Sequence, residues 1–146
     1  IEADLDFSLI RLDAGIQPQA QVAHWGGPTR INQEITYEPQ LLKMFGSGLV
    51  VEDAVPQRQL VAPNGLDGEE DLYVTGVATP GDSGAPALTD SGEALGVVVS
   101  LSPTLRIPEQ GPPYVGVVRI ARLPFNLAIA EKLLGIDLKI ERAPVL

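Results

Sequence analysis

The chain has 146 residues, a formal net charge of −9 and no cysteine. Its length supports one modest domain, which would bury roughly 70% of the surface of the unfolded chain. The acidic balance argues against nucleic acid and anionic membrane as partners, because phosphates require clustered Lys and Arg and these are scattered singly here. Without cysteine there is no disulfide and no thiolate for zinc or catalysis. No apolar run approaches the ~18 residues that cross a bilayer.

Short apolar segments are separated by frequent Gly and Pro, and this pattern predicts an all-β domain. The first segment, residues 6–12, has the composition of a strand and is closed by a turn at residues 13–15. Residues 17–30 are polar and contain Gly and Pro, which is typical of a connector. The remaining predicted strands, in chain order, are 34–38, 41–45, 47–52, 58–62, 72–78, 85–89, 94–101 and 114–120.

The C-terminal part changes from strand-like to helical spacing. Phe125, Ile129 and Leu133 fall on one face of residues 123–134. Gly135 follows this segment at the position where a left-handed residue commonly ends a helix. The spacing therefore predicts one C-terminal helix.

The segment T-P-G-D-S-G-A-P at residues 79–86 carries the chemical signal. A serine hydroxyl becomes a nucleophile when a base takes its proton, and the attacked carbonyl then needs donors for its oxyanion. Gly81 can turn its N–H beside that of Ser83, and Gly84 leaves room for an acyl group. The same four residues G-D-S-G also suit an ordinary β-turn. The position between a strand and a hairpin favours the nucleophile.

Residues 81–86 resemble the G-D-S-G-G-P signature of trypsin-like serine peptidases, with Ala85 in place of the second glycine. Residues 6–12 are similar to the D-I-A-L-L-x-L strand of this family, and residues 98–100 resemble its strand ending in V-V-S. Residues 114–134 look like the last barrel strand and the C-terminal helix. The resemblance covers nearly the whole chain, in the family's order.

The resemblance implies a chymotrypsin-like double β-barrel with a C-terminal α-helix. This chain would hold mainly the second barrel plus one or more strands of the first. Residues 1–16 would end the first barrel, 17–33 connect the barrels, 34–122 form the second barrel and 123–135 form the helix. The peptidase domain would thus be incomplete at its N-terminus.

The resemblance also assigns roles to residues. Ser83 would be the nucleophile, Asp6 the triad aspartate, and the amides of Gly81 and Ser83 the oxyanion hole. Val77 falls at the base of the primary substrate pocket, which favours an apolar or small side chain over Lys or Arg. Ser100 would border that pocket and lie within hydrogen-bonding distance of Asp6. The implied reaction needs no metal or cofactor.

Two acidic features have expected roles of their own. The resemblance places Asp82 behind the oxyanion loop, where a buried carboxylate needs a countercharge. An arginine is the expected partner, because the amine of Ile1 precedes the 6–12 segment and is wrongly placed. The acidic run at residues 67–71 is interpreted as a solvated loop rather than a Ca²⁺ site, since it lacks EF-hand spacing.

The catalytic base is not evident in the sequence. The family order is His, Asp, Ser, so the histidine is expected before Asp6, where only five residues stand. The single histidine, His24, lies in the connector and is expected to be an exposed loop residue. It remains an alternative base, because a triad is defined by geometry. Three explanations stand: an associated cleaved N-terminal chain, a removed N-terminal part, or a natural pseudo-enzyme.

Two functions follow from these features. The first is a serine endopeptidase that hydrolyses peptide or protein substrates through an acyl-enzyme on Ser83. It requires a His-bearing N-terminal segment, because loss of the histidine from such a triad costs on the order of 10⁶ in turnover. The alternative is a catalytically inactive binding or scaffold module on a peptidase fold. A second, histidine-bearing chain in the native sample would distinguish them.

Overall fold

The computed structural model describes residues 7–34, 41–46, 57–61, 70–105 and 114–146. These residues form an antiparallel sheet and one helix, so the prediction of an all-β domain with a C-terminal helix is confirmed. The elements are β1 (Leu41–Phe45), β2 (Gln57–Val61), β3 (Asp71–Ala78), β4 (Pro86–Thr89), β5 (Ala94–Leu105), β6 (Tyr114–Arg122) and α1 (Leu123–Leu134).

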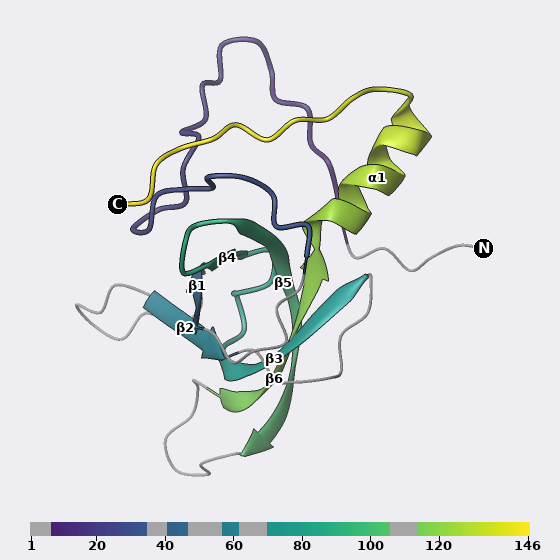
Figure 1. Ribbon diagram of the computed structural model, residues 1–146. Helices are drawn as coiled ribbons and strands as arrows, with labels where there is room; N and C mark the ends of the chain where they lie inside the picture. The colour runs from purple at the N-terminus through teal and green to yellow at the C-terminus, as the bar shows by residue number, and fades with distance from the viewer. Residues whose placement is uncertain (1–6, 35–40, 47–56, 62–69, 106–113) are drawn as a thin grey trace.

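The sheet curls until its two edges meet (Figure 1). The strand order is β1-β2-β3-β6-β5-β4, and β1 pairs with both β2 and β4, which closes the barrel. The pairing of β3 with β6 is continuous from Asp71↔Ala121 to Ala78↔Tyr114. Between β2 and β3 the described contact is the single pair Val61↔Thr75. The barrel is therefore held most firmly along β3, β6 and β5.

The barrel interior is filled by every second side chain along each strand, because successive side chains of a strand point to opposite faces. On β1, Leu42 and Met44 are fully buried, whereas Lys43 between them points outward to Asp90. The apolar faces of residues 85–101 also point into the barrel, with Ala85, Ala87, Leu95 and Val98 buried. The buried core consists of Leu42, Met44, Leu72, Val74, Ala78, Ala85, Ala87, Leu95, Val98, Val118 and Ile120.

Strand β5 extends four residues beyond its predicted end and contains two register shifts against β6. The first shift falls between Val98 and Ser100 and leaves Val99 as an extra residue. The second falls between Pro103 and Leu105. Proline has no backbone N–H to donate to a neighbouring strand, so it is tolerated at such an irregularity. Such bulges bend a strand and re-aim its side chains. The first lies beside the loop that carries Ser83.

The predicted strand at residues 6–12 is wrong for its described part. Residues 7–12 have no regular secondary structure and pair with none of the described strands. A strand exists only where a neighbour takes its hydrogen bonds, so an apolar pattern by itself does not form one. The predicted strands at 34–38 and 47–52 lie outside the described residues, except for Glu34, which is not in a strand. Strand β2 begins one residue before its predicted position.

The connector is irregular, as predicted, and the C-terminal segment fastens it to the molecule. In Figure 1 the chain after α1 runs back toward the connector. Ala143 N–H donates to the Pro28 carbonyl, and Leu146 N–H donates to the Trp25 carbonyl, both at 2.9 Å. A Cβ at Gly26 would collide with the Pro144 carbonyl, so this close approach requires glycine. Two segments far apart in sequence thus hold one another.

The connector is also fastened to the turn between β4 and β5 through Glu93. Arg30 Nε donates to one carboxylate oxygen and Asn32 Nδ2 to the other, each at 2.6 Å. Backbone bonds run alongside, from Ala94 N–H to the Arg30 carbonyl and from Asn32 N–H to the Ala94 carbonyl. The hydrogen bond from Asn32, helped by Arg30, holds the pKa of Glu93 below its ordinary value of 4.5.

This lowered pKa predicts an acid-dependent loss of stability. A carboxylate with a depressed pKa in the folded state stabilises the fold above its unfolded pKa, and that contribution disappears as the pH falls through the folded pKa. Glu93→Gln should cost about 1 kcal/mol near neutral pH, and it should lose less stability than the wild type between about pH 6 and pH 3. Urea unfolding at both pH values measures this. Equal pH dependence in the two proteins would contradict it.

Candidate active site

The loop between β3 and β4 carries Ser83 and is tied to the barrel on both sides. Asp82 N–H donates to the Thr79 carbonyl at 3.1 Å, and Ala85 N–H donates to the Asp82 carbonyl at 2.9 Å. Gly84 N–H donates across to the Val98 carbonyl of β5 at 2.8 Å. The backbone on both sides of Ser83 is therefore held by defined hydrogen bonds.

Two amides of this loop have no backbone acceptor among the described residues. Gly81 has φ 99° and Gly84 has φ 83°, a backbone region that favours glycine. Neither Gly81 N–H nor Ser83 N–H forms a backbone hydrogen bond with any described residue. Both residues are exposed. These are the two amides that the sequence predicts for the oxyanion hole, and a developing oxyanion requires such donors.

Asp82 lies behind the loop, where the carboxylate is shielded from water. The residue is 1% exposed, and its Oδ2 accepts from the N–H of Thr79 at 2.8 Å and from the Thr79 hydroxyl at 3.3 Å. Its other oxygen, Oδ1, lies against the α-carbon of Gly46. The buried position agrees with the prediction, and an arginine partner for Asp82 remains a prediction.

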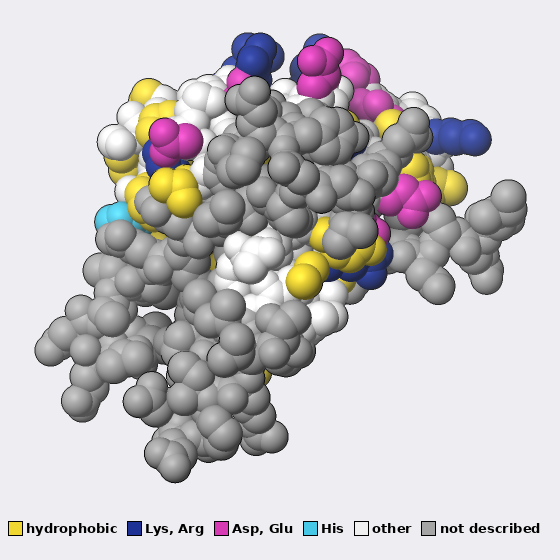
Figure 2. Space-filling model, turned by 60° about the horizontal axis from the view of Figure 1, so that its bottom comes forward, with side chains coloured by type: hydrophobic (Ala, Val, Ile, Leu, Met, Phe, Trp, Pro, Cys, Tyr) yellow, Lys and Arg dark blue, Asp and Glu magenta, His cyan; other side chains and the backbone are white. Residues whose placement is uncertain are grey.

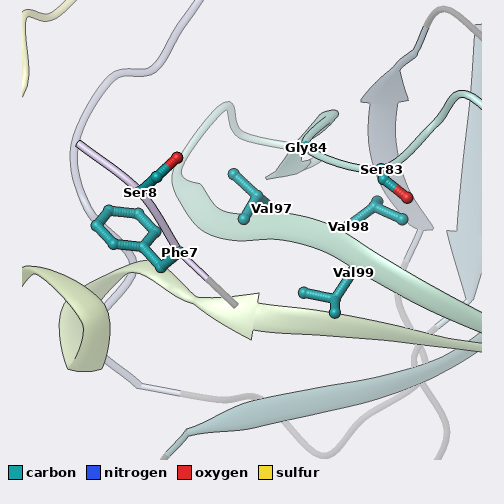
Figure 3. Close-up of a pocket in the computed structure, with 7 residues that line it drawn as sticks. All are labelled: Phe7, Ser8, Ser83, Gly84, Val97, Val98 and Val99. Carbon is teal, nitrogen blue, oxygen red and sulfur yellow. The ribbon is translucent and has the colours of Figure 1, made fainter. Parts of the chain in front are cut away.

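Ser83 opens into a pocket with a volume of about 620 Å³. Figure 3 shows Ser83 at one end, Phe7 and Ser8 at the other, and consecutive residues of β5 between them. None of the described residues that line the pocket is charged. Its lining consists of Phe7, Ser8, Ser83, Gly84, Val97, Val98 and Val99. The pocket therefore offers a hydroxyl and an apolar wall to a ligand.

The described lining of this pocket does not include the other predicted side chains, Asp6, Val77 and Ser100. Asp6 is outside the described residues, but its neighbours Phe7 and Ser8 line the pocket together with Ser83. Val77 lies in β3 opposite Val115, and only its backbone position is described. Ser100 is exposed on β5 and does not belong to the described lining.

Sequence reasoning missed the contribution of Val97 and Val99 to the pocket wall. The resemblance places Ser100 of this strand at the border of the substrate pocket but assigns no role to these two valines. In the structure Val98 is 4% exposed and belongs to the core, whereas Val97 and Val99 are half-buried beside the pocket. A run of consecutive apolar residues in a strand indicates that both faces of the strand are covered. The run Val97-Val98-Val99 was the signal that could have identified the outer face as a pocket wall.

His24 is exposed, as expected for a loop residue, and has a φ of 73°. Its ring meets Trp25 edge-on, with centroids 4.7 Å apart, and stacks against Phe45 at 6.4 Å. Trp25 is itself anchored by a hydrogen bond from Nε1 to the Met44 carbonyl. His24 does not belong to the described lining of the Ser83 pocket.

A second D-S-G tripeptide, Asp90-Ser91-Gly92, occurs in the turn between β4 and β5. Its glycine has φ 81°, close to that of Gly84, and Ser91 is exposed. However, the Ser91 hydroxyl is hydrogen-bonded to the Thr89 hydroxyl at 2.9 Å, and no glycine precedes the aspartate. The two turns therefore share their local chemistry, but only the Ser83 turn has a glycine before its aspartate. Ser91 lines a different pocket, which includes the charged residues Arg30, Glu34 and Glu93.

Some of the described acidic side chains elsewhere form ion pairs. Asp71, at the end of the predicted acidic loop, pairs with Arg119 at 2.9 Å. Within the described ranges no three His, Asp or Glu side chains gather as they would around a metal ion. On the face in Figure 2, both signs of charge are mixed over the described surface. No described helix is sufficiently long and apolar to cross a membrane.

No protein-family model, curated protein or solved structure matches this chain. The site is therefore defined by its own residues and geometry.

Proposed function

We propose that this chain is the nucleophile-bearing part of a trypsin-like serine endopeptidase with a chymotrypsin-like double β-barrel. One observation supports this most strongly. Ser83 is exposed in an uncharged pocket, beside two amides, those of Gly81 and Ser83, that form no backbone hydrogen bond with described residues. A hydroxyl beside two such amide donors suits attack on a carbonyl.

In the proposed reaction the Ser83 hydroxyl gives its proton to a base and its oxygen bonds to the substrate carbonyl carbon. The oxyanion is stabilised by the amides of Gly81 and Ser83. When the C–N bond breaks, the protonated base gives its proton to the leaving amine and an acyl-enzyme remains. Water, deprotonated by the same base, then releases the acid and regenerates Ser83. Asp6 would orient the base.

The base would be a histidine on a segment outside these 146 residues. An exposed apolar surface next to the pocket supports such a partner. Ile10 is 80% exposed and Leu9 and Leu12 are each 47% exposed, in a stretch that pairs with none of the described strands. Exposed apolar side chains on a segment without regular secondary structure are typical of a surface that another polypeptide covers. The same stretch begins with Phe7, which lines the Ser83 pocket.

The substrate would present an apolar or small side chain. Val97 and Val99 form an apolar wall, and the described lining contains no carboxylate that would attract Lys or Arg. This agrees with the preference expected from Val77.

The alternative function is a non-catalytic binding or scaffold module on a peptidase fold. It is favoured by one observation: no histidine is found among the described residues that line the pocket, and His24 instead contacts the rings of Trp25 and Phe45. In that case the pocket would bind an apolar group without reaction.

The two functions differ in the acylation of Ser83 by p-nitrophenyl acetate. At raised pH hydroxide replaces the missing base, and the slow deacylation expected without histidine lets the acyl-enzyme accumulate. We expect acetylation at Ser83 to exceed that at Ser91 about tenfold or more, because Ser91 lacks the second amide donor. Peptide mapping by mass spectrometry measures both sites in one sample. Equal acetylation of the two serines would support the binding module.

A further inference from the structure

Thr79 contacts Asp82 through three of its polar groups. Its carbonyl accepts the Asp82 N–H, its N–H donates to Asp82 Oδ2 and its hydroxyl donates to the same oxygen. Thr79 is 6% exposed and Asp82 is 1% exposed, so water does not compete for these bonds. Hydrogen bonds to a shielded carboxylate are stronger than those between neutral groups.

These bonds enclose Pro80 and Gly81 in a short ring of chain. The ends of the ring, Thr79 and Asp82, are joined by both backbone and side chain, so the peptide planes between them have little freedom. The direction of the Gly81 N–H, which is one of the two oxyanion donors, follows from those planes. Ser83 comes directly after the ring, so its amide and hydroxyl are set by the same constraint.

Gly46, which follows β1, borders the other oxygen of the Asp82 carboxylate, Oδ1. Its φ is not in the left-handed region, so glycine is not needed there for backbone conformation. A Cβ at this position would instead meet Oδ1 and Cγ of Asp82. Gly46 is buried, and its missing side chain is the space that the Asp82 carboxylate occupies. The Asp82 carboxylate thus lies between Gly46 and Thr79.

We infer that Thr79 is a positioning residue, which sets the oxyanion donors of Gly81 and Ser83 by clamping Asp82 against Gly46. The inference rests on the proposed function, because it concerns the donors of that reaction. Thr79 does not touch the substrate. Its effect on the reaction is transmitted through Asp82.

The test uses a fluorophosphonate on the full chain, with imidazole added as a small-molecule base. Thr79→Val keeps the shape and removes the hydroxyl, and we expect the maximal labelling rate of Ser83 to fall about tenfold to hundredfold. The concentration for half-maximal rate should stay within about twofold, since reagent binding is unaffected. Thr79→Ser should restore the rate. Thr75→Val, on the exposed face of β3, is the matched control and should match the wild type.

Gly46→Ala is a second, independent variant. Its methyl group should displace the Asp82 carboxylate while Thr79 stays intact, and the labelling rate should fall as in Thr79→Val. Wild-type rates in both Thr79→Val and Gly46→Ala would overturn the inference.

A measurement without reaction separates this inference from the proposed function. In amide nuclear magnetic resonance spectra, Gly81 and Ser83 should shift in Thr79→Val and return in Thr79→Ser, while Gly92 in the other D-S-G turn stays unchanged. If imidazole does not activate wild-type Ser83, the proposed function fails. The spectra still test whether Thr79 positions the amides of Gly81 and Ser83. Gly81 and Ser83 resonances in Thr79→Val identical to those in Thr75→Val would overturn the clamp even if Ser83 reacts.

Discussion

Ser83 is expected to react very slowly with a fluorophosphonate in the isolated chain and rapidly once a histidine-bearing segment is bound. A phosphonylating reagent requires the same deprotonated hydroxyl and the same oxyanion donors as a peptide carbonyl. Loss of the histidine from such a triad costs on the order of 10⁶ in turnover, so restoring it should produce a gain of comparable scale. Intact-mass time courses, followed by peptide mapping, measure the rate at Ser83.

Three variants make this result specific. Ser83→Ala should abolish labelling, whereas Ser91→Ala should leave it unchanged, because the second D-S-G turn lacks the preceding glycine amide and its Ser91 hydroxyl is hydrogen-bonded to that of Thr89. Rapid labelling of the isolated chain would show that a base is already present, and its loss in His24→Ala would assign that role to His24. Absence of labelling in the completed protein would favour the binding module and direct attention to Ala85, the departure within the motif.

The second large effect concerns stability. Ile120 on β6 is completely buried in the barrel core. Ile120→Ala should lower the free energy of unfolding by about 2–5 kcal/mol, because the barrel loses apolar contacts and retains part of the cavity. Denaturant unfolding followed by circular dichroism measures this loss.

The matched control is the same substitution at an exposed isoleucine. Ile10 is 80% exposed, so Ile10→Ala should change the unfolding free energy of this chain by less than about 0.5 kcal/mol. If Ile10 belongs to the surface that binds the histidine-bearing segment, Ile10→Ala should weaken that association instead. A large loss of stability in Ile10→Ala would mean that residues 7–12 are packed within this chain, which would contradict the proposed partner surface.

The elements that local chemistry specifies were predicted closely. Strand β1 and helix α1 have their predicted bounds, because proline and glycine residues separate the segments. The helix ends at Gly135, which has φ 67° and donates its N–H to the Glu131 carbonyl, as the glycine predicted. Residues 7–12 carry an equally clear apolar pattern, yet they form no strand. A helix makes its hydrogen bonds within its own segment, whereas a strand depends on a neighbour.

The candidate site also has a part that the local sequence indicates and a part that depends on tertiary contacts. The sequence alone proposes Ser83 and Gly81 as site residues, because the chemical requirement and the turn conformation both depend on adjacent residues. It did not reveal that Val97 and Val99 line the pocket, or that Asp82 is held between Thr79 and Gly46. Those contacts bring together the end of β1, the loop after β3 and the strand β5. Only closure of the barrel decides them, because side chains distant in sequence meet where the sheet curvature and the register place them.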